Sequence, residues 1–449
     1  MANNSPSSVP LPDPNRIRAH VIDSLGRYWP KDAALLASLP VVIAGIPPKI
    51  EPPLRLASVT LPDWARVDGI NGKILIPTEA QGHPDSAGQA PWQNTNWFLA
   101  AFLLLECWHE RIWEARHGPI HSYSFRLRNW DVRAWGHAWV NRIALFLRRW
   151  AAYCRNTTPE ALFGPLPASS VLMTHDIDAI EKTPAIRFKQ SAFSAVNALH
   201  QLVRGNPRAS IRCARQILRF FWGKEDWWRF EGLFSAEEKV NMQSLFHFYA
   251  DPRPKTIKRR LFDPGYDIKR QRIRGLVAEL YRRGHQAGLH PGFDSWNDWK
   301  KIAKQKKYLE SVTGGSIAAC RQHWLRFSWQ ATWSCQGKAG LSFDTTLMFN
   351  NRPGFRNSSA LRWKPWNTKM NTQHQLTAQP SVLMDSHFYD YQVLSDSERR
   401  SQMSYWLAEC QAVHGEIAVL WHPQTLTVDY GWGNGFNELL KVITQMREG

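Results

Sequence analysis

The second half of the chain alternates short apolar runs with longer segments of helical periodicity. The helical segments include 273–284, which ends at Gly284, and 299–314. The strand-like runs are VLM (171–173), SLFHFYAD (244–251), HQAGLHP (285–291), AACRQHWLRF (318–327), LSFDTTLMF (341–349), SVLMDSHFYD (381–390) and EIAVLWHPQT (416–425). Repeated strand–helix units of this kind predict an α/β fold with a parallel sheet, either open or closed into a barrel.

Polar residues follow the apolar runs at strand end after strand end. They are Asp176, Asp178, His290, Arg321, Asp344 and His422. In parallel sheets and α/β barrels, ligands and catalytic groups gather at the carboxyl ends of the strands. These six residues stand at five strand ends, and one shared active-site rim explains them better than five unrelated structural roles.

The segment THDID at 174–178 is the densest of these clusters. Two carboxylates and an imidazole within a few residues can bind a metal ion, hold a catalytic base, or do both. The structural alternative is that Asp176 and Asp178 only cap the helix that follows.

The first 165 residues carry no recognisable chemistry and predict a mixed α/β domain of unknown role. Long helices are expected at 95–117, with Thr95 as the cap, and at 131–154, beginning at Asp131. A proline-containing linker around 156–170 leads into a second domain that spans 166–449. This second domain contains a basic helical insertion at about 184–240.

The chain is strongly basic, with 56 Lys and Arg against 38 Asp and Glu and a net charge of +18. Five arginines of the insertion recur at three- or four-residue spacing: Arg204, Arg208, Arg212, Arg215 and Arg219. Such a helical face suits phosphates, an anionic membrane surface or a polyanionic glycan, and the alternative is a solvated helix face. No zinc finger, phosphate-binding loop or RNA-recognition motif accompanies the charge, so a nucleic-acid partner is not expected.

The six cysteines are scattered and none has CxxC spacing, so no zinc knuckle or dithiol motif is readable. The N-terminus lacks the pattern of a secretory signal, and the longest apolar run, 97–108, is too short to span a bilayer. These features predict a soluble protein of the reducing cytoplasm, with peripheral attachment to the inner membrane as an option.

The order of the motifs from residue 169 onward resembles the polysaccharide deacetylases of carbohydrate esterase family 4. THDID is similar to the first family motif, Thr-Phe-Asp-Asp-Gly, and GHQAGLHP to the Gly-His-Glu-Ile-Gly-x-His segment of the second. CRQHWLRF, GLSFDTTL and AVLWHPQT resemble the third, fourth and fifth motifs. HDxD, HPxxD and the late LWHP also resemble a divergent bacterial branch that is associated with surface-polysaccharide genes. The resemblance implies a distorted (β/α) barrel preceded by an N-terminal domain.

The resemblance also implies a set of roles around a divalent metal ion. Asp176 would be the catalytic base, held ionised by Arg321, and His422 the catalytic acid, oriented by Asp344. The metal ligands would be Asp178, His290 and Asp294. Zinc is the favoured ion, with manganese, cobalt and nickel as alternatives.

Three departures from the family pattern leave alternatives open. Ile177 separates the two aspartates, so the roles of Asp176 and Asp178 could be exchanged or His175 recruited. Asp294 stands where the family has its second metal histidine, and the glycine that follows the aspartate pair is absent. A relative that binds sugar without activity is therefore an alternative.

We expect a metal-dependent hydrolase that removes an N-acyl group, acetyl in the first instance, from an amino sugar. Its expected partner is an amino-sugar-containing glycan or a lipid-linked sugar of lipopolysaccharide or capsule biosynthesis. The rival predictions are a catalytically inactive carbohydrate-binding protein and a metal-dependent nuclease, in which Asp176, Asp178 and Asp294 would hold magnesium. The nuclease is disfavoured because it leaves Arg321 and His422 without a role.

Overall fold

The computed structural model describes residues 9–41, 49–65, 72–82, 90–203, 205–392 and 394–448. The chain forms two compact units, each built from several segments. The first unit comprises Met1–Val171, Leu325–Val382 and Tyr405–Ala418, and the second Leu172–Trp324, Leu383–Ser404 and Val419–Gly449. No described helix combines the length and apolarity needed to cross a bilayer.

The first unit holds helices and short strands. Its elements from the N-terminal part are α1 (Pro14–Ser24), β1 (Leu56–Thr60), β2 (Lys73–Pro77), α2 (Trp97–Leu105), α3 (Trp108–His117), α4 (Trp139–Cys154) and α5 (Pro159–Phe163). Those from later in the chain are α12 (Thr332–Lys338), β7 (Phe343–Asp344), β8 (Trp366–Asn367), β9 (Thr372–Gln373) and β10 (Thr377–Ala378). The pairs β1–β2 and β8–β9 are antiparallel.

The two long helices predicted in the N-terminal part are shorter than expected. The helix predicted over 95–117 is divided into α2 and α3 by Cys107, whose backbone is left-handed with φ 44°. Asn96, and not Thr95, caps α2. Asp131 caps only the single-turn helix η6 (Val132–Trp135). Helix α4 begins at Trp139, four residues after η6 ends.

The second unit holds most of the alternating strands and helices. Its elements, together with those that cross its boundaries, are β3 (Ser170–Ile177), α6 (Pro184–Val203), α7 (Pro207–Trp222), α8 (Phe230–Glu238), β4 (Ser244–Tyr249), α9 (Ile257–Phe262), α10 (Gln271–Arg282), β5 (Gln286–His290), α11 (Trp299–Thr313), β6 (Ala319–Cys320), β11 (Ser381–Met384), α13 (Asp385–Tyr389), α14 (Asp396–Ala412), β12 (Glu416–Leu420) and α15 (Gly433–Glu448). Gly314, with φ 70°, ends α11, as the sequence predicts for a helix that stops at a glycine.

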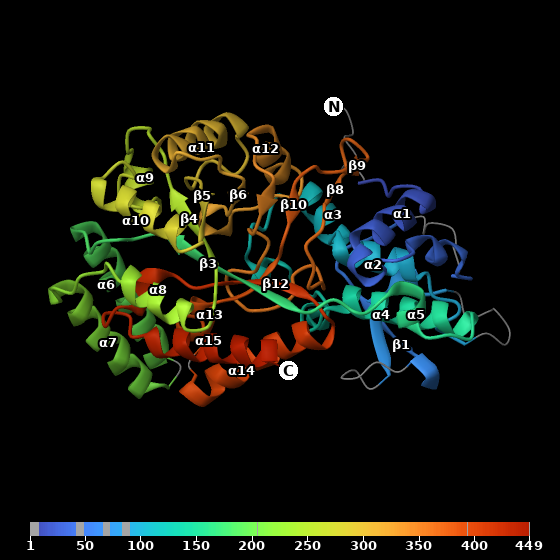
Figure 1. The fold of residues 1–449 in the computed structure, drawn as a ribbon. Helices are drawn as coiled ribbons and strands as arrows, with labels where there is room; N and C mark the ends of the chain where they lie inside the picture. Colours follow the sequence, from blue (N-terminus) through green and yellow to red (C-terminus); the bar gives the residue numbers. More distant parts are fainter. Residues whose placement is uncertain are drawn as a thin grey trace, which may run out of the picture. The chain divides into compact units, whose positions relative to one another are not determined.

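The main sheet has eight strands in the order β10-β7-β6-β5-β4-β3-β12-β11. Strands β3, β4, β5, β6, β10 and β12 are labelled in Figure 1. The pairs β3–β4, β4–β5, β5–β6 and β7–β10 are parallel. The sheet curls as an incomplete barrel, and the predicted distorted (β/α) barrel class is confirmed. Because β3, β4, β5 and β6 are parallel neighbours, their carboxyl ends lie along the same edge.

The register of the central strands places polar side chains next to one another. Asp176 on β3 lies opposite His247 on β4, and His247 lies opposite Gly288 on β5. A Cβ atom at Gly288 would come within 2.8 Å of Cδ2 of His247. The glycine therefore makes room for the His247 imidazole beside Asp176.

Candidate metal centre

Three side chains from the ends of β3, β5 and β6 converge on one point. Asp178 follows β3, His290 is the last residue of β5, and His323 follows β6. Oδ1 of Asp178 lies 3.4 Å from Nε2 of His290 and 3.4 Å from Nδ1 of His323. These two ring nitrogens are 2.7 Å apart. The three ligand-type atoms thus form one compact cluster.

Backbone carbonyl groups fix both imidazole rings of this cluster. Nδ1 of His290 donates to the carbonyl oxygen of Arg321 at 2.7 Å, and Nε2 of His323 donates to that of Phe262 at 2.6 Å. A carbonyl only accepts, so neutral rings must direct the lone pairs of their remaining nitrogens at each other. Two lone pairs and a carboxylate oxygen facing one another require a cation, which is either a proton or a metal ion.

The donor set fits a divalent transition metal. Oδ1 of Asp178 is buried and accepts no hydrogen bond from the described part of the chain. Two neutral imidazoles and a carboxylate are common ligands of zinc, and they also suit manganese, cobalt and nickel. Carbonyl groups that orient the ring N–H groups are the usual second layer of such sites.

Asp176 lies beside the cluster in a cationic environment. Its Oδ1 is 3.3 Å from Nη1 of Arg321 and 3.1 Å from Nδ1 of His247, and its Oδ2 is 3.9 Å from Nε2 of His290. Nη1 of Arg321 also donates to Oγ1 of Thr174 at 2.7 Å. Burial would raise the pKa of Asp176, but Arg321, His290 and His247 together hold it well below its usual range. Asp176 is therefore an ionised carboxylate next to the cluster.

His422 lies on the other side of Asp178 and is held by a carboxylate. Its Nδ1 is 2.9 Å from Oδ1 of Asp385, and its backbone N–H donates to Oδ2 of Asp385 at 2.9 Å. Its Nε2 is 3.7 Å from Oδ2 of Asp178. Burial lowers the pKa of His422, but the charges of Asp385, Asp178 and Asp176 outweigh burial and raise it to about 10. In this arrangement His422 is an imidazolium that can give up a proton.

Replacing Asp385 by asparagine should lower the pKa of His422 in metal-free protein from about 10 toward its ordinary 6.5. Because the folded-state pKa is raised, the protonated ring stabilises the fold fully below about pH 6.5, and this contribution is lost as pH rises through about 10. Wild-type protein should therefore lose more stability than the variant between these two pH values. Histidine NMR titration and denaturant unfolding measure both effects, and an unchanged pKa would show that Asp385 does not hold the proton.

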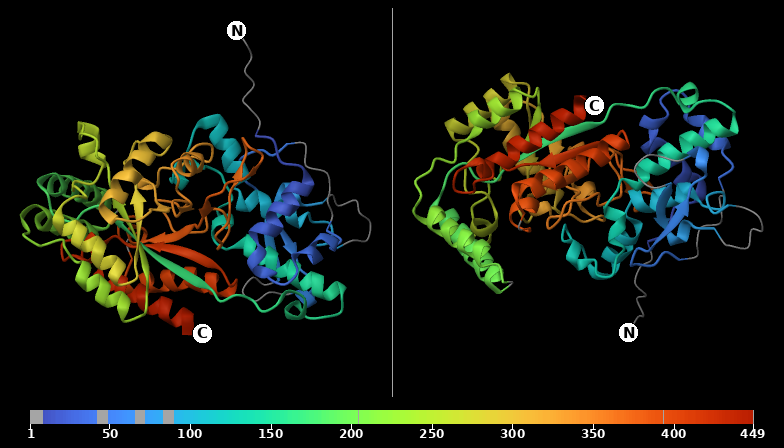
Figure 2. Two further views of the ribbon diagram at one scale, coloured as in Figure 1. Left: turned by 45° about the horizontal axis from the view of Figure 1, so that its top comes forward. Right: turned by 90° about the horizontal axis from the view of Figure 1, so that it is seen from below.

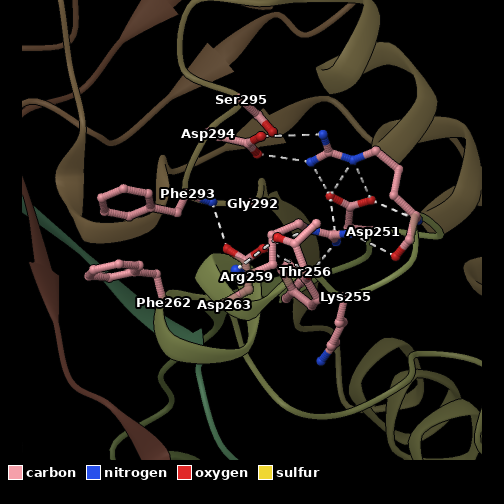
Figure 3. Close-up of polar contacts among 12 residues, drawn as sticks. Asp251, Lys255, Thr256, Arg259, Phe262, Asp263, Gly292, Phe293, Asp294 and Ser295 are labelled. Atoms are coloured by element: carbon pink, nitrogen blue, oxygen red, sulfur yellow. Dashed lines mark hydrogen bonds and ion pairs between the residues drawn. The ribbon is translucent and has the colours of Figure 1, made fainter.

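The structure does not bring Asp294 into the metal cluster. Its Oδ1 lies 2.9 Å from Nη2 of Arg253, and its Oδ2 lies 3.4 Å from Nζ of Lys301. Arg253 also pairs with Asp251, which in turn pairs with Arg259, so that this network joins the loops after β4 and β5 (Figure 3). Arg253, which lies 41 residues earlier in the chain, pairs with the carboxylate that the sequence assigned to the metal ion.

Asp344 also has a different environment from the one predicted. It is fully buried, and its carboxylate accepts hydrogen bonds from Nε1 of Trp333 at 3.0 Å and Nε2 of Gln336 at 2.7 Å. Burial raises the pKa of Asp344, in spite of these donors. The carboxylate that orients His422 is Asp385, which directly follows β11.

His175 points to the other face of β3 from Asp176. Its Nδ1 is hydrogen-bonded to the carbonyl of Trp421 at 2.6 Å, and its Nε2 lies 2.8 Å from Oε1 of Glu237. Adjacent strand residues face opposite sides, whereas Asp176 and Asp178 are two residues apart and share a side. The inserted Ile177 thus does not separate the two carboxylates.

Three residues at or beside the cluster have no role in the sequence-based prediction: His247, His323 and Asp385. His323 stands two residues after Arg321, so alternation along the strand end could have identified it. Asp385 follows an apolar run as the other candidates do, and that signal was available. His247 lies inside a strand that is buried throughout, and nothing in its local sequence marks it.

The sequence matches no family model and no curated protein. Among solved structures, the chain is similar to a protein described as a polysaccharide deacetylase from Mycobacterium smegmatis, at 14% identity and a TM-score of 0.37, with 62% of this chain and 84% of that chain covered. A polysaccharide deacetylase from Bacillus cereus matches at 9% identity and a TM-score of 0.31, over 62% and 88% of the two chains. A CE4 family pseudoenzyme from Bacillus anthracis matches at 10% identity and a TM-score of 0.26, over 63% and 61%. Two of these three structures are thus described as polysaccharide deacetylases and the third as a CE4 family pseudoenzyme.

Proposed function

We propose that the protein is a metal-dependent hydrolase that removes an N-acyl group, acetyl in the first instance, from an amino sugar. The observation that carries this proposal is the convergence of Asp178, His290 and His323, with facing lone pairs, between an ionised Asp176 and a protonated His422. Amide hydrolysis needs a polarised carbonyl, a base for the attacking water and an acid for the departing nitrogen. This arrangement offers a group for each task.

We assign the metal ligands to Asp178, His290 and His323, with His323 in place of Asp294. A divalent ion at this position would polarise the acyl carbonyl and lower the pKa of the attacking water. Asp176 accepts the proton of that water, because Arg321 keeps its carboxylate ionised. His422 donates a proton to the amine nitrogen as the C–N bond breaks, with its ring held in place by Asp385.

A cluster of three aromatic side chains beside His323 supports a sugar as the substrate. The rings of Phe262 and Phe293 stack with their centroids 4.5 Å apart, and Trp324 lies 6.2 Å and 6.4 Å from them. The Trp324 side chain is 37% exposed, next to a ligand of the cluster. Exposed aromatic faces offer an apolar surface with a polar edge, which suits the faces of a sugar ring.

The biological context that we propose is surface-polysaccharide assembly, such as lipopolysaccharide or capsule, at the cytoplasmic face of the inner membrane. The net charge of +18 supports an anionic environment, such as lipid headgroups or a lipid-linked diphosphate sugar. The motif order along the chain supports an N-acylated glycan as the substrate class.

Metal removal tests this function directly. Purified protein is incubated with N-acetylated sugar nucleotides and with lipid-linked amino sugars, and acetate is measured with and without a chelator. We expect acetate release that the chelator abolishes and that added zinc restores. If fully metal-loaded protein binds such sugars but releases no acetate, the protein is a carbohydrate-binding relative. Phosphodiester cleavage that Asp178→Ala abolishes would indicate the nuclease instead.

A further inference from the structure

The helical pair α6–α7 has a composition unlike the rest of the chain. Residues 184–222 contain seven lysines and arginines and no acidic residue. The basic residues are Arg187, Lys189, Arg204, Arg208, Arg212, Arg215 and Arg219. The two helices pack against each other as an antiparallel hairpin (Figure 2). This segment, the basic hairpin, therefore has a sequence charge of +7 over 39 residues.

The root of the hairpin is fixed to the body of its unit. Phe220 and Trp227 are buried together with Ala179. Nζ of Lys182 and Nε1 of Trp227 both lie 2.7 Å from Oδ2 of Asp429. The helices therefore project from an ordered base and not from a loose linker.

Large apolar side chains are exposed on both helices of the hairpin. On α6 they recur at helical spacing on one face: Phe188 (73% exposed), Val196 (66%), Leu199 (64%), Leu202 (57%) and Val203 (79%). On α7 they are Ile211, Leu218, Phe221 and Trp222, the last 72% exposed. The exposed arginines Arg208, Arg215 and Arg219 lie on the adjacent face of α7. A helix of a globular protein normally buries such an apolar stripe, so this one indicates a partner.

We propose that the basic hairpin docks on the surface of an anionic lipid bilayer. Amphipathic helices with Phe, Leu and Trp on one side and Lys or Arg beside them lie at the boundary between headgroups and acyl chains. Anionic headgroups complement the exposed Arg208, Arg215 and Arg219, whereas the acyl region accepts the apolar stripe. A second copy of the hairpin does not fit as well, because its association would bring two sets of cations together without an acidic residue to pair with either.

The position of the hairpin links docking to the candidate metal centre. α6 begins six residues after Asp178, and the root contacts Asp429, which lies seven residues after His422. A docked hairpin would hold the strand ends that carry these residues close to the membrane surface. This one consequence rests on the proposed function. If the protein is the proposed hydrolase, docking favours a lipid-linked amino sugar over a soluble one as its substrate.

Vesicle binding of the full-length protein tests the docking itself. The protein is sedimented with vesicles of phosphatidylglycerol and phosphatidylcholine, and with vesicles of phosphatidylcholine alone. We expect binding to the anionic vesicles that weakens with salt, and little binding to the neutral ones. The triple variant Arg208→Gln, Arg215→Gln, Arg219→Gln should bind roughly 100-fold more weakly, since each cation near an anionic surface contributes about a fivefold factor.

Two further variants make the test specific. The control Arg55→Gln, Arg128→Gln, Lys364→Gln removes the same charge from exposed positions of the other unit and should bind as wild type does. The variant Phe188→Ser, Leu199→Ser, Trp222→Ser should lose binding although its charge is unchanged. Equal binding of the hairpin and control triple variants overturns the proposal, and so does binding to DNA or to a second copy without vesicle binding. Vesicle binding needs no metal and no turnover, so its outcome is independent of acetate release.

Discussion

Replacing His323 by alanine should remove the bound metal ion and abolish hydrolysis. The imidazole of His323 is 2.7 Å from that of His290 and 3.4 Å from Asp178, and the Phe262 carbonyl orients it. Loss of a residue that only orients a ligand already costs about 10- to 100-fold in metal affinity or activity, so loss of the ligand should cost roughly 100-fold or more. Elemental analysis of the purified variant and the rate of acetate release measure the two effects.

Asp294→Ala is the matched control for this prediction. Its carboxylate pairs with Arg253 and Lys301 and does not lie in the cluster, so the variant should keep its metal. A protein that loses metal on Asp294→Ala and keeps it on His323→Ala would reverse the assignment. His290→Ala should behave as His323→Ala does, which makes the assignment testable at a second ligand.

Asp176→Asn should lower hydrolysis while metal binding is retained. A positioned general base contributes about 100- to 10,000-fold to the rate, and the amide of asparagine cannot take a proton from water. The measurement is kcat at saturating substrate, together with the metal content of the same preparation. Comparable rates for variant and wild type would show that Asp176 is structural.

The same substitution also affects stability, and this has to be separated from catalysis. Asparagine would remove the carboxylate that pairs with the buried Arg321 guanidinium, and breaking a buried pair in this way typically costs about 3–5 kcal/mol. Asp176→Glu keeps the charge and moves the carboxylate by one methylene. We expect this variant to melt close to wild type and still to lose most of its activity, because a base must lie within hydrogen-bonding reach of the proton that it accepts.

The sequence predicts the class of fold and the edge of the sheet on which the site lies. Apolar runs followed by polar residues locate the ends of β3, β5 and β12, where Asp178, His290 and His422 stand. The period of two along a strand also explains why Asp176 and Asp178 share one side in spite of Ile177 between them. Both inferences depend on local geometry, which the sequence specifies.

The sequence assigns the orientation of His422 to Asp344, whereas Asp385 holds its ring in the structure. This difference depends on the order of strands across the sheet. Both aspartates follow apolar runs, and the sequence does not say which of the two strands neighbours β12. In the structure β11 is the neighbour of β12, so Asp385 at its end reaches His422. Strand order follows from packing over the whole chain and leaves no local mark.

The partner of Asp294 likewise cannot be predicted from the local sequence. Its position four residues after His290 suits a ligand, but Arg253 on a separate loop pairs with its carboxylate. Similarly, α2 and α3 read as one helix because their apolar pattern is continuous, although Cys107 adopts a left-handed backbone between them. For Asp294 a distant contact outweighs a local preference.

The most direct test of the metal centre is a crystal structure of metal-loaded protein with anomalous diffraction data. We predict one ion within about 2.0–2.3 Å of a carboxylate oxygen of Asp178, Nε2 of His290 and Nδ1 of His323. An ion bound beside Asp294, or fully loaded protein whose ion lies away from all three side chains, would contradict the proposed site.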